Sequence, residues 1–130
     1  MAAVSPSTIL AVDDDDINLK MLVFMLDDFG YKVRTATCGS EALESVAKQP
    51  PDLVVLDVMM PGLDGFEVLQ LLKADAKTEK IPVVMLTALS DDASRRRALK
   101  LGASRFFTKP ADRREVETAL RDLLKRGSAA

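Results

Sequence analysis

The sequence predicts an α/β protein with a doubly wound, five-stranded parallel sheet and five helices. Five apolar runs alternate with five helix-like segments along the chain, which is the pattern of repeated strand–helix units. Its 130 residues fit one domain that can bury a core of its own. The expected strands occupy 8–12, 31–36, 53–57, 82–87 and 105–108.

The apolar content of each run indicates where its strand lies in the sheet. Ile9–Val12, Leu53–Leu56 and Val83–Leu86 are continuously apolar, as expected for central strands that helices cover on both faces. Residues 31–36 alternate between polar and apolar side chains, which favours a half-exposed edge strand. The run 105–108 is short and also suits an edge.

Two of the expected helices carry much apolar surface. Residues 16–29 are apolar around most of the helix circumference, and we expect this helix to be the most buried. The last helix begins after Asp112, a favoured N-cap, and Glu115 follows three residues later as in a capping box. Its apolar side chains recur at helical spacing: Val116, Ala119, Leu120, Leu123 and Leu124.

The segment 90–101 is a helix with little to anchor it. Ser90 is its expected N-cap, and Gly102 can terminate it. Its interior contains Arg95-Arg96-Arg97, so little apolar area is available for burial. We therefore expect this helix to be the element most able to move.

Composition excludes several classes of site and protein. The chain has no histidine, which rules out Ser-His-Asp and Cys-His nucleophiles and the usual zinc sites within it. Cys38 is the single cysteine, so no internal disulfide can form, and we interpret it as a small loop residue. No apolar run approaches the roughly 20 residues that span a bilayer. We expect a cytoplasmic protein without a membrane partner.

Charge is distributed unevenly along the chain. Residues 1–89 carry twice as many acidic as basic side chains, whereas residues 90–130 carry an excess of Lys and Arg. A basic segment can mark a nucleic-acid surface, but here acidic residues are interleaved with the basic ones. We expect a solvated or protein-binding face and no direct contact with nucleic acid.

Polar residues lie at the carboxyl ends of four of the expected strands. Asp13 and Asp14 follow the first, Asp57 ends the third, Thr87 ends the fourth before Ala88, and Lys109-Pro110 follows the fifth. Parallel strands bring their carboxyl ends to one edge of the sheet, where open α/β folds bind ligands. Carboxylates that lie close together repel one another and favour a hard cation such as Mg²⁺ or Mn²⁺.

The same edge has the groups that phosphoryl transfer needs. A carboxylate such as Asp57 can act as a nucleophile and form an aspartyl phosphate. Lys109 can pair with a phosphate or a carboxylate, and the Thr87 hydroxyl can donate to a phosphate oxygen. Phosphoryl transfer depends mainly on positioning and charge neutralisation, which this set of side chains supplies.

Five motifs stand in order along the chain: Val12-Asp13-Asp14, residues 57–67, Leu86-Thr87-Ala88, Gly102-Ala103 and Lys109-Pro110. In these motifs the sequence resembles the receiver domain of two-component response regulators, including the chemotaxis regulators. The resemblance extends from about Thr8 to Lys125 and predicts a receiver domain at 8–126 between flexible ends at 1–7 and 127–130.

The resemblance implies a flavodoxin-like sheet in the order 2-1-3-4-5 and a role for each site residue. Asp57 is the expected phosphoacceptor, and Asp13, Asp14, Asp57 and the Met59 backbone carbonyl are the expected Mg²⁺ ligands. The resemblance assigns phosphoryl binding to Thr87, Ala88 and Lys109.

Further roles follow from the same resemblance. Thr87 and Phe106 are the expected switch pair, and Pro110 is a candidate cis-proline. Because Phe106 has no hydroxyl, a switch hydrogen bond of the kind that tyrosine makes is unavailable. Met59 and Leu89, which are apolar, occupy positions that help to govern the access of hydrolytic water, and this predicts a long-lived phosphorylated state.

A histidine kinase or a histidine phosphotransfer protein is the expected phosphoryl donor. We expect it to dock on Asn18, Met21, Pro110 and Ala111, although Met21 at helical spacing is equally compatible with core packing. The expected output surface is formed by the fourth helix, fifth strand and fifth helix within 90–126, where a homodimer or an effector would bind. The sequence leaves open whether this is a stand-alone regulator or part of a longer protein.

Two other functions remain open at this stage. One is a small phosphatase that passes through an aspartyl phosphate, but no second carboxylate follows Asp57 closely enough to serve as its general acid. The other is an interaction scaffold that is never phosphorylated, against which the complete Asp, Thr and Lys set argues. We expect no enzymatic activity beyond the protein's own phosphorylation and dephosphorylation.

Overall fold

The computed structural model describes residues 6–128, without the side chains of 126–128. The predicted flexible ends, 1–7 and 127–130, lie mostly outside this range. Strands and helices alternate throughout, as the sequence predicts: β1 (Thr8–Val12), α1 (Asp16–Asp28), β2 (Lys32–Ala36), α2 (Gly39–Lys48), β3 (Leu53–Leu56), α3 (Gly65–Ala74), β4 (Val83–Thr87), α4 (Asp92–Lys100), β5 (Arg105–Thr108) and α5 (Arg113–Ser128).

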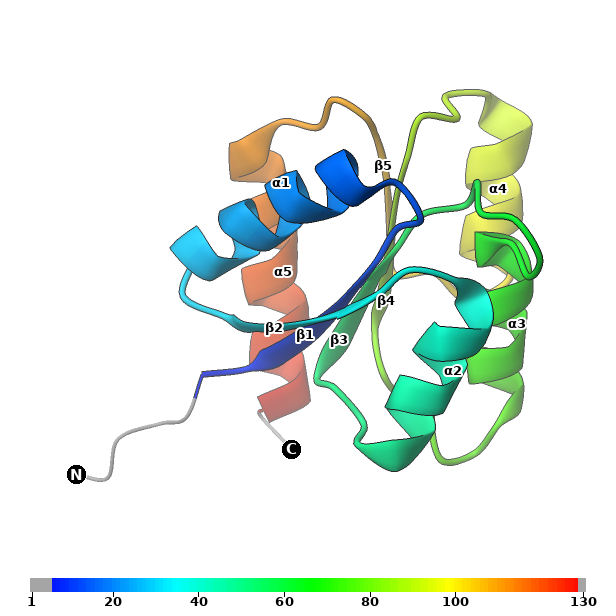
Figure 1. The fold of residues 1–130 in the computed structure, drawn as a ribbon, viewed down its shortest axis with the longest axis horizontal. Coiled ribbons are helices and arrows are strands. Elements are labelled where there is room, and N and C mark those ends of the chain that lie inside the picture. Colours follow the sequence, from blue (N-terminus) through cyan, green and yellow to red (C-terminus); the bar gives the residue numbers. More distant parts are fainter. Residues whose placement is uncertain (1–5, 129–130) are drawn as a thin grey trace.

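The five strands form one parallel sheet in the order β2-β1-β3-β4-β5, which confirms the predicted fold and the two edge strands. Helices α1 and α5 cover one face, and α2, α3 and α4 cover the other (Figure 1). Successive side chains of the central strands alternate between two apolar clusters: Ile9 and Ala11 pack beneath α1 and α5, whereas Leu10 and Val12 pack beneath the other three helices.

Helix α1 is less buried than the sequence predicted. Its buried residues are Leu19, Leu22 and Leu26, whereas Met21 and Phe24 have 66% and 73% of their surface exposed. The two groups lie on different faces, and a helix can press only one face onto the sheet. Helix α3 is more deeply covered, with five of its ten residues buried.

Helix α4 is weakly anchored, as predicted. The structure describes all nine residues of α4, and of these nine only Ala98 is buried. The predicted N-cap was wrong, because Asp91 and not Ser90 caps the helix. The Asp91 carboxylate accepts hydrogen bonds from the backbone N–H and the hydroxyl of Ser94, each at 3.0 Å, so the helix begins one residue later than a Ser90 cap would place it.

Local capping also fixes the helices that border the site. Asp112 accepts backbone hydrogen bonds from Arg114 and Glu115, which confirms it as the cap of α5. A reciprocal capping box that the sequence analysis missed joins Asp64 and Glu67 at the start of α3. Within residues 6–128, no helix is long and apolar enough to cross a membrane.

Candidate functional site

The backbone ladder of the sheet positions two of the acidic residues directly. The Asp57 N–H donates to the Val12 carbonyl at 3.1 Å, and the Asp13 N–H donates to the Ala36 carbonyl at 3.2 Å. Each bond extends the pairing of two strands by one residue past their carboxyl ends. Asp13 and Asp57 are therefore held rigidly, and both side chains are buried.

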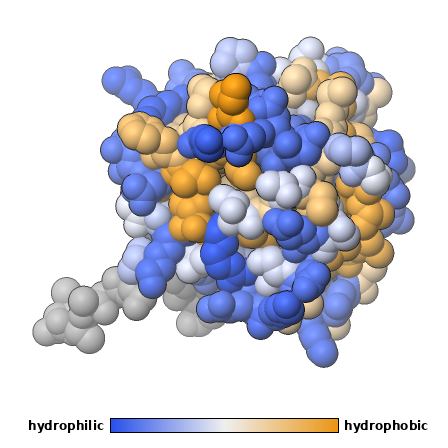
Figure 2. Space-filling model, viewed as in Figure 1, coloured by the Kyte–Doolittle hydropathy of each residue, from blue (hydrophilic) through white to orange (hydrophobic). Residues whose placement is uncertain are grey.

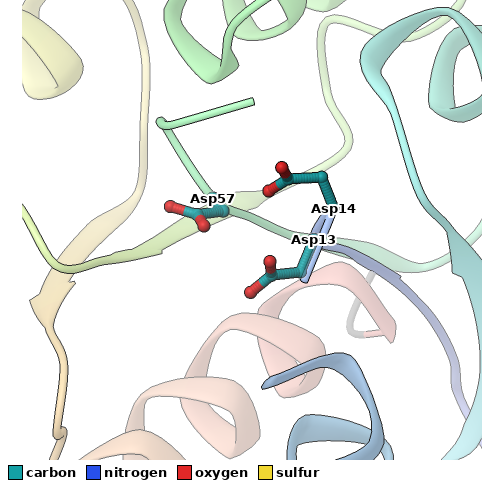
Figure 3. A group of neighbouring side chains, drawn as sticks. All are labelled: Asp13, Asp14 and Asp57. Carbon is teal, nitrogen blue, oxygen red and sulfur yellow. The ribbon is translucent and has the colours of Figure 1, made fainter. Parts of the chain in front are cut away.

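Three carboxylates meet at this edge of the sheet. Asp13, Asp14 and Asp57 each place a carboxylate oxygen within 4.8 Å of the other two, and Figure 3 shows them together where β1 and β3 end. Oxygen ligands of this kind suit a hard divalent cation. Met59, two residues after Asp57, has an exposed side chain and donates its N–H to Asp57 Oδ1 at 3.3 Å, so its backbone is next to the cluster.

Lys109 joins the cluster from the end of β5. Its Nζ lies 2.7 Å from Asp13 Oδ2 and 3.5 Å from Asp57 Oδ2. Burial by itself would lower the pKa of Lys109, but the hydrogen bond that Lys109 donates to Asp13 and the charges of Asp57 and Asp13 outweigh it and leave the pKa raised. The ammonium group therefore stays charged at neutral pH and partly compensates the three acidic side chains.

Gly65 allows α3 to begin directly against Asp57. A Cβ atom at this position would lie 2.2 Å from the Asp57 carbonyl oxygen and 2.7 Å from Val58 Cα. The Gly65 N–H donates to the Val58 carbonyl at 2.9 Å. The turn after Asp57 is thus closed by the first residue of α3, and the two segments are in direct backbone contact.

Thr87 ends β4 beside the cluster and is fully buried. Its hydroxyl oxygen accepts a hydrogen bond from the Leu89 N–H at 3.3 Å, and its carbonyl accepts one from the Lys109 N–H at 2.7 Å. Ala88, the next residue, is exposed. The Lys109–Pro110 peptide bond is cis, which confirms the candidate cis-proline.

Phe106 is already in the core. It is 5% exposed and belongs to the apolar cluster that includes Met85 and Ala98. Because phenylalanine has no hydroxyl, burying this side chain leaves no polar atom without a partner. Phe106, the expected switch partner of Thr87, is therefore buried in the conformation that this structure shows.

The four residues predicted to dock a donor lie at the same end of the molecule as the acidic cluster. Asn18, Met21 and Pro110 are exposed, and Ala111 is half-buried against the core beneath α1 and α5. The exposure of Met21 excludes the alternative in which it packs into the core.

Two exposed apolar neighbours of Met21 were not predicted from the sequence. Ile17 and Phe24 are 70% and 73% exposed, and at i, i+4 and i+7 the three side chains form one apolar stripe along α1. Figure 2 shows apolar atoms gathered around α1 on this face. A shallow cavity of about 490 Å³ beside the stripe is lined by Lys20, Met21, Phe24, Met25 and Arg113. The signal in the sequence was a helix with more apolar positions than one buried face can hold.

Comparisons with known proteins agree with this architecture. A family model for the response regulator receiver domain matches residues 9–121. The chain is 48% identical over 104 residues to the response regulator PleD of Caulobacter vibrioides, covering 80% of this chain and 23% of that protein. It is 45% identical over 123 residues to the probable transcriptional regulator ycf27 of Cyanophora paradoxa, covering 95% of this chain and 50% of that protein.

A solved structure gives the same result at the level of the fold. The crystal structure of a putative response regulator from Chloroflexus aurantiacus superposes with a TM-score of 0.89 at 35% identity, covering 93% of this chain and 99% of that one. The chain spans half the length, or less, of the two curated relatives named above. From its sequence, its sheet order and these likenesses, the chain belongs to the response regulator receiver domain family.

Proposed function

We propose that Asp57 accepts a phosphoryl group from the phosphohistidine of a histidine kinase or a histidine phosphotransfer protein. The observation that supports this most directly is the cluster of three carboxylates with the Lys109 ammonium 2.7 Å from Asp13 and 3.5 Å from Asp57. A buried carboxylate beside a fixed cation and a prospective metal site is well placed for attack on phosphorus.

The transfer forms one bond and breaks one. A carboxylate oxygen of Asp57 attacks the phosphorus atom, a P–O bond forms, and the P–N bond to the donor imidazole breaks with its electron pair leaving on the imidazole nitrogen. Lys109 is then close enough to pair with the new phosphoryl oxygens. The Thr87 hydroxyl and the Ala88 N–H at the end of β4 are the further donors that we assign to this group.

We assign the metal ligands to Asp13, Asp14, Asp57 and the backbone carbonyl of Met59. The donor set consists of oxygen atoms alone, which fits Mg²⁺ and also Mn²⁺. When bound there, the cation neutralises the carboxylates and the negative charge of the phosphoryl group. The same chemistry allows a small phosphodonor to phosphorylate the domain without a kinase, so self-phosphorylation and the loss of that phosphate are the reactions that we assign to it.

We assign donor docking to the apolar stripe Ile17, Met21 and Phe24, together with Asn18 and the Pro110-Ala111 turn. The stripe is exposed and runs along the helix that begins beside the acidic cluster. Exposed apolar groups of this size are characteristic of protein-binding surfaces. A helical donor would cover them while it presents its phosphohistidine to Asp57.

We assign the output to α4, β5 and α5, within a receiver domain at 8–126. Helix α4 has one buried residue to anchor it, and β5 is an edge strand. A cavity of about 400 Å³ lies between the last two elements and is lined partly by Arg105, Phe107, Arg114 and Glu115. Its mixed charges suit a second copy of the domain or an effector in the cytoplasm.

Treatment with acetyl phosphate tests this proposal. We expect the intact mass to increase by one phosphoryl group in the presence of Mg²⁺ and to stay unchanged in EDTA. Phosphorylation that proceeds equally in EDTA would refute the metal assignment. No modification under either condition would refute the phosphoacceptor function.

A further inference from the structure

Helix α4 is held to the rest of the domain by few side chains. Ala98 is its buried residue, and Leu89 and Leu101, which flank the helix, are half-buried against the core. One further contact comes from the charged surface of the helix. The guanidinium carbon of Arg97 lies 4.3 Å from the centroid of the Phe66 ring, over its face.

Arg97 differs in this respect from its two neighbours. Arg95, Arg96 and Arg97 are all exposed, and of these three described side chains Arg97 is the one with an aromatic ring beneath it. Successive helical residues point about 100° apart, so Arg95 and Arg96 face other directions. A cation over an aromatic face is attractive even at an exposed site.

Phe66 connects this contact to the phosphoacceptor. It is buried, and it follows Gly65, whose Cβ position is 2.2 Å from the Asp57 carbonyl oxygen. The Gly65 N–H is bonded to the Val58 carbonyl at 2.9 Å. A change in the turn after Asp57 therefore acts on the first residue of α3, and through the next residue on the ring that Arg97 covers.

There is space beside this contact. A cavity of about 490 Å³ is lined by Met59, Met60 and Leu89 together with Phe66 and Arg97. It lies between the turn that follows the acceptor and the start of α4. A helix anchored by one buried alanine, with a cavity on this side, is able to shift without compressing a packed core.

We propose that the Arg97–Phe66 contact holds α4 in its resting position and is broken when Asp57 is phosphorylated. Phe106 is buried in the same structure in which the Arg97–Phe66 contact is formed, so burial of Phe106 does not by itself free α4. Arg97 is thus a positioning residue that acts through α4 and sets how readily the domain reaches its phosphorylated conformation. This inference rests on the proposed function of Asp57.

Binding of beryllofluoride, which mimics the phosphoryl group, tests the proposal by linkage. A contact present only in the resting state opposes the mimic, so its loss strengthens binding. In the presence of Mg²⁺ we expect Arg97→Ala to bind beryllofluoride about two- to fivefold more tightly than the wild type, from the size of exposed cation–π contacts. Arg95→Ala and Arg96→Ala remove the same charge from the same helix, and we expect wild-type affinity from both.

A second variant and a second measurement separate this effect from a general loss of charge. Phe66→Leu keeps an apolar group in the core but removes the aromatic face, so we expect a similar gain and little further gain in the Arg97→Ala/Phe66→Leu double variant. In the free protein, amides of residues 92–100 should exchange faster in Arg97→Ala than in Arg95→Ala.

Three outcomes would overturn the role of Arg97: an affinity equal to that of the two control variants, a weaker affinity than the wild type, or fully additive effects of the two substitutions. A wild-type protein that binds no beryllofluoride would instead refute the proposed function of Asp57. The two failures are therefore distinguishable.

Discussion

The three carboxylates of the site have different surroundings. Asp13 is buried and bonded to Lys109, and Asp57 is buried with Lys109 at 3.5 Å, whereas Asp14 is exposed. Among the described residues, no side chain or backbone group donates a hydrogen bond to the Asp14 carboxylate. In the absence of a cation, its negative charge therefore only repels those of Asp13 and Asp57. We therefore expect Asp14 to contribute mainly to metal binding and not to the stability of the fold.

Replacement of Asp14 should have opposite effects with and without metal. In EDTA, Asp14→Asn should unfold at the same or a higher temperature than the wild type, with a gain of about 1 kcal/mol or less because a like charge is removed. Added Mg²⁺ should stabilise the wild type by ligand linkage and the variant much less. Thermal denaturation in the two buffers measures both effects. Equal stabilisation of the two proteins by Mg²⁺ would contradict the assignment of Asp14 as a ligand.

Met59 and Leu89 should give the phosphorylated protein a long lifetime. Both line the cavity next to the acceptor turn, and neither can orient a water molecule by hydrogen bonding. Dephosphorylation of the wild type should therefore be slower than that of Met59→Asn/Leu89→Glu, measured as loss of the phosphoryl mass after removal of the donor. Faster hydrolysis in the wild type would contradict this role of the two residues.

At the scale of whole elements, α1 is where sequence reasoning succeeded in part. The sequence predicted the helix and a docking surface with Asn18 and Met21, while core packing stayed open for Met21. It did not indicate that Ile17 and Phe24 are exposed beside them. Periodicity gives the apolar positions of a helix, whereas the sheet decides which of them it covers. Two overlapping apolar stripes on one helix left that choice to tertiary packing.

The exposed stripe on α1 should be needed for transfer from a donor protein but not for folding. Met21→Arg and Phe24→Arg should retain the wild-type unfolding temperature and react normally with acetyl phosphate, because both side chains point into solvent. Phosphotransfer from a histidine kinase should slow by about tenfold or more, the effect of losing an apolar anchor from an interface. Leu71→Arg, at a 48% exposed position of α3, is the matched control. A kinase that phosphorylates all three variants at the same rate would place the docking surface elsewhere.

For helix α4, the sequence predicted the burial correctly but not the cap or the contacts. Its weak anchoring was predictable from the scarcity of apolar residues, but its cap and its contact with α3 were not. Either Ser90 or Asp91 can cap a helix, and only the reach of the Asp91 carboxylate to Ser94 decides between them. The Arg97–Phe66 contact joins residues far apart in the chain, and no local pattern indicates it.

For the whole molecule, the alternation of strands and helices predicted the parallel sheet, and the sheet predicted which site residues lie together. Parallel strands bring their carboxyl ends together, so Asp13, Asp57, Thr87 and Lys109 were predictable as neighbours before their distances were known. The burial of Phe106 was not predictable in this way. It depends on how β5 packs under α4, and an aromatic residue in an edge strand is compatible with either position.

Activation should move α4 and β5 more than the rest of the domain. Shifting the domain from mostly resting to mostly active requires about 5 kcal/mol of differential interaction. Helix α4 is the element that this energy should displace, because Ala98 is its one buried residue. Addition of beryllofluoride should shift amide resonances throughout residues 90–108 while those of α2, on the same face of the sheet, change little. Shifts confined to the loops around Asp57 would contradict a transmitted conformational change.

The central claim is that Asp57 is the residue that becomes phosphorylated. Borohydride reduction of an aspartyl phosphate converts that aspartate to homoserine, and peptide mapping then locates it. After reaction with acetyl phosphate and Mg²⁺, the account predicts homoserine at position 57 and unmodified aspartate at 13 and 14, with no homoserine in Asp57→Asn. Homoserine at position 13 or 14 of the wild type, or an Asp57→Asn protein that is still modified to the same extent, would contradict it.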